Sequence, residues 1–203
     1  MSQSDKKTAH HPRSGAYQRI ATEEACAPSE MLAIYRRILE KRDVDPGFKG
    51  LMGFYMTSPS ARARHIMRCL QDLDQLRLQH MDECGIDKQV IALTAPGVQV
   101  MDTATAVSFS RVANDQLAEA VRRHPTRFAG MIAVAPQDPV AAAKEIERGV
   151  GKLGMNAVVV NSHTHGEYLS DPKFWDIFAA AESHKVPIYL HPTSLPASML
   201  QPF

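Results

Sequence analysis

The chain has 203 residues, a formal net charge of +1 and 44% hydrophobic residues, which is typical of a soluble globular protein with one sizeable core. The near-neutral charge favours neither a nucleic-acid partner nor a membrane surface, and the sequence lacks the long apolar run of a membrane-spanning helix. The polar N-terminus also lacks the apolar stretch of a secretory signal, so we expect a cytoplasmic protein.

Residues 1–18 are predicted to form a flexible N-terminal arm. Beyond it, short apolar runs alternate with longer stretches of helical period. The runs predict strands at residues 19–23, 89–94, 128–134, 157–161 and 187–191. Alternating strands and helices favour right-handed βαβ units and a parallel sheet, and four of the runs are nearly continuously apolar, as in strands buried on both faces.

Amphipathic helices are predicted between the strands. Apolar positions at helical spacing run from Ile66 to Cys84 and are followed by Gly85, which predicts one helix that ends there. Similar patterns predict helices over residues 109–121, 143–153 and 174–181.

The segment around residues 40–60 does not follow this alternation of strands and amphipathic helices, because its part PGFKGLMGFYMTSP is rich in Gly, Pro and aromatic residues. We interpret it as a loop inserted between the first strand and the helix that begins near Ser60. Such an insertion would lie over the carboxyl end of the sheet, where α/β proteins bind ligands. The alternative is a surface loop that covers a hydrophobic edge.

Polar side chains follow several strands at the carboxyl edge of the predicted sheet. The first strand ends on Glu23 and Glu24, the fourth on Asn161 and the fifth on His191. A carboxylate and an imidazole directed at one point suit a divalent transition metal, but the spacing alone favours the alternative, a hydrogen-bonded core histidine and a solvated glutamate. Because side chains alternate along a strand, with Ala21 and Glu23 expected on the same face, only one of the two acids can face the interior.

Two further groups of side chains lie near this edge. His163 and His165 have the spacing of residues that share a strand face, but they follow the apolar run in a turn-like segment. Arg62 and Arg64 open the predicted helix after the insertion and can bind a carboxylate, or can belong to a solvated helix face.

Six motifs taken together resemble the amidohydrolase superfamily, in its branch of metal-dependent aromatic decarboxylases. They are RIATEEA, GFYMTSPSAR, PGVQ, AVAPQDP, NSHTHG and YLHP. Within that branch the chain most resembles the 5-carboxyvanillate decarboxylases, with the γ-resorcylate decarboxylases further off. The resemblance implies a (β/α)8 TIM-like barrel, of which residues 19–203 would form about the first five β/α units.

The resemblance also implies roles for individual residues. Glu23 and His191 would bind one divalent ion, Mn²⁺ or Zn²⁺, because carboxylate and imidazole ligands suit both. Tyr55 and Arg62 would contact the aromatic substrate and its carboxylate, and Asn161 and His163 would lie near the substrate. The family's catalytic histidine and metal-binding aspartate, which is also its proton donor, are expected beyond Phe203. Ala25 replaces a histidine ligand that some relatives carry.

The implied function is the metal-dependent, non-oxidative decarboxylation of an ortho-hydroxy aromatic acid, with 5-carboxyvanillate converted to vanillate. The expected partner is a small aromatic carboxylate, with no nucleic acid or membrane, and the full-length enzyme is expected to form a dimer or tetramer. One alternative is a hydrolase or hydratase of the same superfamily acting on a ring-cleavage product. The other is an inactive truncated chain or a fragment of a longer enzyme.

Overall fold

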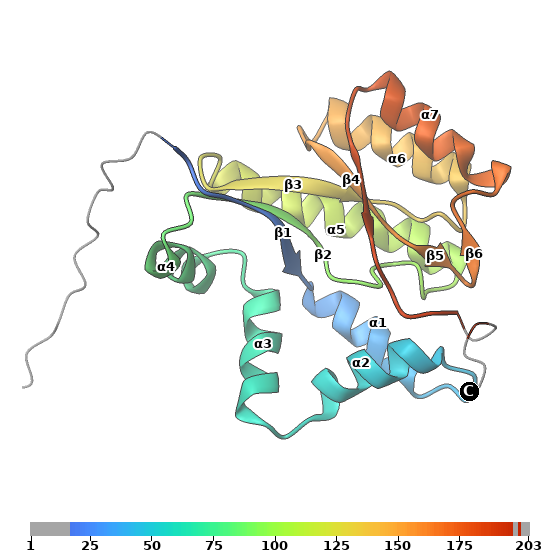
Figure 1. The fold of residues 1–203 in the computed structure, drawn as a ribbon, viewed down its shortest axis with the longest axis horizontal. Coiled ribbons are helices and arrows are strands. Elements are labelled where there is room, and N and C mark those ends of the chain that lie inside the picture. The colour runs from blue at the N-terminus through green and yellow to red at the C-terminus, as the bar shows by residue number, and fades with distance from the viewer. Residues whose placement is uncertain (1–16, 197–198, 200–203) are drawn as a thin grey trace, which may run out of the picture.

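The computed structural model describes residues 17–196 and 199, and its centre is a curled sheet of five parallel strands (Figure 1). The strands lie in the order β1 (Ile20–Cys26), β2 (Lys88–Leu93), β3 (Phe128–Ala133), β4 (Ala157–Asn161) and β7 (Ile188–His191). Every neighbouring pair is parallel. The predicted α/β fold with a parallel sheet is confirmed, and the curl is that of half a barrel.

The predicted strands are confirmed at their apolar runs, and the three central strands are largely buried on both faces of the sheet, whereas β1 and β7 are partly exposed. All five residues of β4 are buried. The predicted end of the first strand at residue 23 is wrong, since Ala25 and Cys26 continue the pairing with Ala92 and Leu93 of β2. Glu23 and Glu24 therefore lie within β1 rather than at its end.

Helices follow the strands and cover the sheet. They are α1 (Ser29–Leu39), α2 (Pro46–Thr57), α3 (Ala61–Gln71), α4 (Gln75–Cys84), α5 (Thr103–Arg123), α6 (Pro139–Gly151) and α7 (Trp175–Ser183). A short hairpin, β5 (His163–Thr164) and β6 (Glu167–Tyr168), and the turn η1 (Pro172–Phe174) follow β4. Within the described ranges, none of the helices is long and apolar enough to cross a bilayer.

The single helix predicted from Ile66 to Cys84 is wrong, because the chain breaks at Asp72. The Asp72 carboxylate accepts hydrogen bonds from the backbone N–H groups of Asp74 (2.9 Å) and Arg77 (3.0 Å). It thereby competes with continuation of the helix and starts a new one. Gly85, with φ of 66°, ends α4 as predicted.

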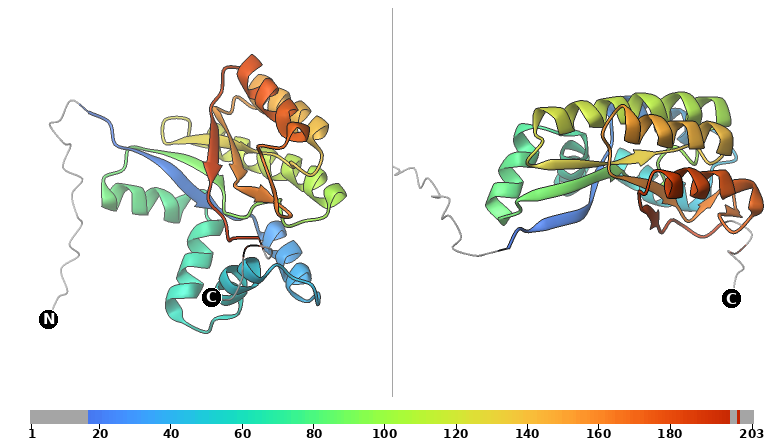
Figure 2. Two further views of the ribbon diagram at one scale, coloured as in Figure 1. Left: turned by 45° about the vertical axis from the view of Figure 1, so that its right-hand side comes forward. Right: turned by 90° about the horizontal axis from the view of Figure 1, so that it is seen from above.

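The segment around residues 40–60 is largely helical, so its interpretation as a loop is wrong. The Asp45 carboxylate accepts a hydrogen bond from the Phe48 N–H (2.7 Å), and Pro46 occupies the first turn of α2. Figure 1 shows α1, α2 and α3 gathered beyond the arrowheads of β1 and β7, and Figure 2 shows the same arrangement from two other sides. The segment thus has the predicted position over the carboxyl end of the sheet.

A buried tyrosine attaches these helices to the sheet. The Tyr35 hydroxyl, from α1, donates a hydrogen bond to the carbonyl of Gly97 in the loop after β2 (2.7 Å). Its ring meets Phe48 of α2 edge to face, with centroids 4.8 Å apart. Burial raises the pKa of Tyr35 because the phenolate would lose its hydration. The hydroxyl therefore stays a donor, and α1 and α2 have a defined place beside the carboxyl edge.

We predict that Gly149→Ala destabilises the protein, because α6 approaches β3 closely at this glycine. A Cβ atom on Gly149 would lie 2.6 Å from two side-chain atoms of Ile132. The overpacked core should lower the free energy of unfolding by about 1–3 kcal/mol, measured by urea denaturation. Gly151→Ala on the same helix is the matched control, because a Cβ there meets nothing within 4 Å. Equal stability of the two variants would contradict this packing.

Candidate functional site

A β-bulge in β1 determines which of the two adjacent acids, Glu23 or Glu24, lies on which face of the sheet. Ala21 pairs with Gln89 and Glu24 with Ile91, so that two residues of β1 lie opposite one residue of β2. Gln89 and Ile91 share one face of β2 because side chains alternate along a strand. The expected regular alternation, with Ala21 and Glu23 on one face, is therefore wrong, but the expectation that only one acid faces the interior holds.

Glu23 meets His191, from the strand at the other end of the sheet. The Oε1 atom of Glu23 lies 2.8 Å from the Nε2 atom of His191, and the two side chains are 46% and 25% exposed. The Nδ1 atom of His191 contacts the carbonyl of Pro192. The imidazole of His191 is therefore engaged at both nitrogens, by the carbonyl of Pro192 and by the carboxylate of Glu23. The pair is thus both oriented and accessible.

Tyr189 holds the second oxygen of the same carboxylate. It stands two residues before His191 on β7, so both side chains lie on one face. Its hydroxyl donates a hydrogen bond to Oε2 of Glu23. This hydrogen bond raises the pKa of Tyr189, because loss of the proton would place a phenolate beside a carboxylate. Glu23 is therefore held through Oε2 and presents Oε1 to His191.

Glu24 faces a buried arginine on the other side of the sheet. Its Oε2 atom lies 4.0 Å from Nη1 of Arg77, a residue of α4 that is only 7% exposed. The Arg77 guanidinium also donates hydrogen bonds to the side chain of Gln89 (3.2 Å) and to the carbonyl of Ala25 (2.8 Å). Arg77 thus fixes the strand just after Glu23.

A cavity of about 870 Å³ opens beside His191. Residues from the end of α1, the segment that connects it to α2 and the first part of α2, between positions 38 and 52, form one wall, and the loop after β2, residues 95–102, forms another. The remaining wall comes from His163, His165, Gly166 and residues 191–196. The cavity has the size of a small-molecule site and lies at the carboxyl ends of the strands, where ligands of α/β folds bind.

Asn161 belongs to a buried hydrogen-bond network around Gln99. Its side-chain amide donates to the carbonyl of Pro96 (3.0 Å) and to the side chain of Gln99 (3.0 Å). The Gln99 amide in turn donates to the carbonyl of His163 (3.0 Å) and to the Thr164 hydroxyl (2.7 Å). Asn161 does not line the cavity, and its substrate role stays a prediction. Its Oδ1 atom is buried without a hydrogen-bond partner among the described residues.

His163 lines the cavity, but the backbone engages both of its ring nitrogens. Nδ1 accepts a hydrogen bond from the Gly166 N–H (3.2 Å), so Nε2 carries the proton and donates to the carbonyl of Ser194 (2.7 Å). In this arrangement neither nitrogen has a free lone pair for a metal. The predicted role of His163 near the substrate stays a prediction.

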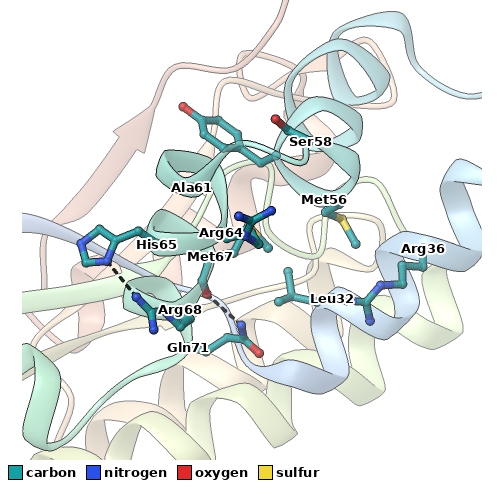
Figure 3. Close-up of a pocket in the computed structure, with 11 residues that line it drawn as sticks. Leu32, Arg36, Met56, Ser58, Ala61, Arg64, His65, Met67, Arg68 and Gln71 are labelled. Carbon is teal, nitrogen blue, oxygen red and sulfur yellow. Dashed lines mark hydrogen bonds between the residues drawn. The ribbon is translucent and has the colours of Figure 1, made fainter.

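Tyr55 and Arg62 lie away from the cavity beside His191. Tyr55, half-buried at the end of α2, lines a second cavity between α1, α2 and α3 (Figure 3). Arg62 is exposed in the first turn of α3 and lines neither cavity. Their predicted contacts with a substrate stay predictions.

Three residues of this region were missed from the sequence: Tyr189, Gln99 and Arg77. Strand alternation from His191 could have indicated Tyr189, since i and i+2 share a face. Gln99 and Arg77 carry no such signal, because their partners come from distant segments of the chain.

The curled parallel sheet, with a carboxylate and an imidazole at its carboxyl edge, defines the first half of an amidohydrolase-type (β/α)8 barrel. The chain belongs to the amidohydrolase family, whose sequence model matches residues 70–202.

Among its relatives, the γ-resorcylate decarboxylase of Polaromonas sp. (strain JS666) is 38% identical over 141 residues, which make up 66% of this chain and 42% of that enzyme. The crystal structure of 5-carboxyvanillate decarboxylase from Novosphingobium aromaticivorans, with bound manganese and 3-methoxy-4-hydroxy-5-nitrobenzoic acid, is 46% identical with a TM-score of 0.90. The match covers 92% of this chain and 54% of the 5-carboxyvanillate decarboxylase chain. The 2,6-dihydroxybenzoate decarboxylase from Rhizobium is 29% identical with a TM-score of 0.75, over 91% and 52% of the two chains. The chain thus spans about half the length of these relatives.

We predict that Gln99→Leu lowers the free energy of unfolding by about 2–4 kcal/mol, because it leaves several buried polar groups around Asn161 without partners. Thermal or urea denaturation measures the loss. Gln79→Leu is the control, since Gln79 is exposed on α4 and its side chain bonds only to Glu83 among the described residues. A Gln99→Leu variant as stable as the control would show that the network contributes little.

Proposed function

We propose that this chain contributes to a metal-dependent, non-oxidative decarboxylase of ortho-hydroxy aromatic acids, with 5-carboxyvanillate as the substrate. The observation that carries the proposal is the contact between Glu23 and His191 at the carboxyl edge of the curled sheet. The decarboxylases that this chain resembles support the reaction type, and the manganese-containing structure supports the choice of substrate.

The Glu23–His191 pair fits a divalent ion, Mn²⁺ or Zn²⁺. Bonds from such an ion to carboxylate oxygen and imidazole nitrogen are about 2.0–2.2 Å long, so two adjacent ligands lie roughly 3 Å apart. Oε1 of Glu23 and Nε2 of His191 are 2.8 Å apart and contact each other, and each side chain is held at its other end, so an ion would replace this contact with two bonds of its own. Among the described residues, no group of three His, Cys, Asp or Glu side chains could hold an ion, so this part of the chain supplies two ligands.

When bound, the ion would hold the substrate carboxylate and the neighbouring phenol oxygen and lower the pKa of that phenol. Glu23 supplies a negative charge and His191 a neutral nitrogen. In the proposed reaction the ring carbon that bears the carboxylate gains a proton, the bond from that carbon to the carboxylate breaks, CO₂ leaves and the ring regains its aromaticity. Arg62 is proposed to orient the carboxylate with its two-pronged guanidinium, and Tyr55 to contact the ring.

We expect Glu23→Gln and His191→Ala each to lower metal affinity more than about tenfold, because even residues that only support a ligand change affinity 10- to 100-fold. The measurement is manganese and zinc content per chain after dialysis against a metal buffer. Glu24→Gln is the matched control, since Glu24 faces Arg77 on the other side of the sheet. Equal metal loss from both glutamate variants would refute the assignment.

A substrate panel tests the reaction itself. With Mn²⁺ or Zn²⁺ present we expect CO₂ release from 5-carboxyvanillate, slower release from 2,6-dihydroxybenzoate, and no hydrolysis of muconate-type acids. Mass spectrometry of the products distinguishes decarboxylation from addition of water. Turnover of a muconate-type acid, without CO₂ from any hydroxybenzoate, would replace the decarboxylase with a hydrolase or hydratase.

The same assay tests Arg62. An ammonium group cannot reproduce a two-point guanidinium contact, so Arg62→Lys should lower kcat/KM about 10- to 100-fold and leave metal content unchanged. Arg37→Lys, at an exposed arginine that lines neither cavity, is the control. If the two variants are equally active, Arg62 does not touch the substrate.

A further inference from the structure

The hydroxyl of Tyr189 engages the one oxygen of Glu23 that does not face His191. Oε1 of Glu23 lies 2.8 Å from Nε2 of His191, whereas Oε2 accepts a hydrogen bond from Tyr189. Tyr189 and His191 share a face of β7, and their ring centroids are 6.1 Å apart with planes at 69° to each other. The carboxyl ends of β1 and β7 lie at the same edge of the sheet (Figure 1), so that β7 divides the carboxylate between two of its side chains.

A single hydroxyl group thus determines the environment of Oε2. Among the residues that the structure describes, Tyr189 is the only side chain that donates to this oxygen. The strand that carries Glu23 is fixed as well, because the Arg77 guanidinium donates to the carbonyl of Ala25, two residues further along β1 (2.8 Å). An ion bound by both oxygens of Glu23 would have to share Oε2 with the phenol, which weakens the bond that this oxygen can offer.

We propose that Tyr189 keeps Glu23 a one-oxygen ligand of the metal ion and thereby makes the site favour Zn²⁺ over Ca²⁺. The inference rests on the metal site of the proposed function and adds the choice of ion. Zn²⁺ is satisfied by about four ligands, and one carboxylate oxygen and one imidazole nitrogen supply two of them. Ca²⁺ takes roughly six to eight oxygen ligands and can obtain two of them from one carboxylate. A carboxylate whose second oxygen is engaged by a phenol therefore suits Zn²⁺ better than Ca²⁺.

The test compares Tyr189→Phe with the parent protein. Equilibrium dialysis of chelator-treated protein against metal buffers measures the Zn²⁺ and Ca²⁺ affinities. The substitution keeps the ring of a half-buried residue and removes only the hydroxyl, so we expect the variant to fold. The ratio of Zn²⁺ affinity to Ca²⁺ affinity should fall about tenfold or more, because groups that support a metal ligand change its affinity about 10- to 100-fold. Tyr17→Phe, at a tyrosine that is 71% exposed, is the control and should change the ratio less than about twofold.

A double-mutant cycle shows whether the effect passes through the carboxylate of Glu23. Glu23→Gln leaves one amide oxygen that can bind an ion, and the amide nitrogen beside it is only a donor. Removing the hydroxyl of Tyr189 then releases no second oxygen for a metal. Adding Tyr189→Phe to Glu23→Gln should therefore change the affinity ratio less than about twofold.

An equal fall in Zn²⁺ and Ca²⁺ affinity in Tyr189→Phe would overturn the inference, because a purely structural role of Tyr189 weakens the binding of both ions alike. A change in the ratio that persists in the Glu23→Gln background would overturn it as well. If the parent protein binds neither ion in a way that depends on Glu23, the metal site and the inference both fail. If Tyr189→Phe changes the ratio as expected but the protein releases no CO₂ from any hydroxybenzoate, the proposed reaction fails and the inference stands.

Discussion

The curl of the five-stranded sheet is the constraint on which the candidate site depends. Neighbouring strands lie about 4.8 Å apart, so the first and last of five strands in a flat sheet would be separated by roughly 19 Å. No glutamate and histidine could meet across that distance. In the curled sheet Glu23 of β1 and His191 of β7 approach to 2.8 Å. The site is therefore a product of the curvature of the sheet, which the twist of parallel strands and the helices packed outside it maintain.

Groups behind the pair determine how it is presented. Tyr189 holds one oxygen of Glu23, the carbonyl of Pro192 engages one nitrogen of His191, and Arg77 fixes β1 from the opposite face. A carboxylate and an imidazole left to rotate freely would have to be ordered by any ligand at an entropic cost. The hydrogen bonds reduce that cost in advance, which is how supporting residues tune metal sites.

The strands could be predicted because each is a compact apolar run. Helices α1 and α2, which precede β2, were not predicted from the sequence. The glycines of α2 hide its helical character, and the side-chain cap of Asp45 on Phe48 becomes visible only in three dimensions. The sequence indicated that Glu23 and His191 would lie near each other, because parallel strands place their carboxyl ends at one edge, although Glu23 lies within β1 rather than at its end. Gln99 was not, since its partners lie more than sixty residues away in sequence. Long-range polar networks leave no periodic trace in a sequence.

The bulge in β1 determines the contacts of the two adjacent acids, Glu23 and Glu24. With the bulge present, Glu23 faces His191 and Glu24 faces Arg77. If the later part of the strand slipped by one residue and the bulge disappeared, Glu23 would take the register position of Glu24, and Glu24 would turn to the inner face. Either register then offers one carboxylate to each face. Because two adjacent residues of β1 are acidic, a shift of one residue in register would still leave a carboxylate on each face of the sheet. In most strands, such a shift would exchange a polar side chain for an apolar one.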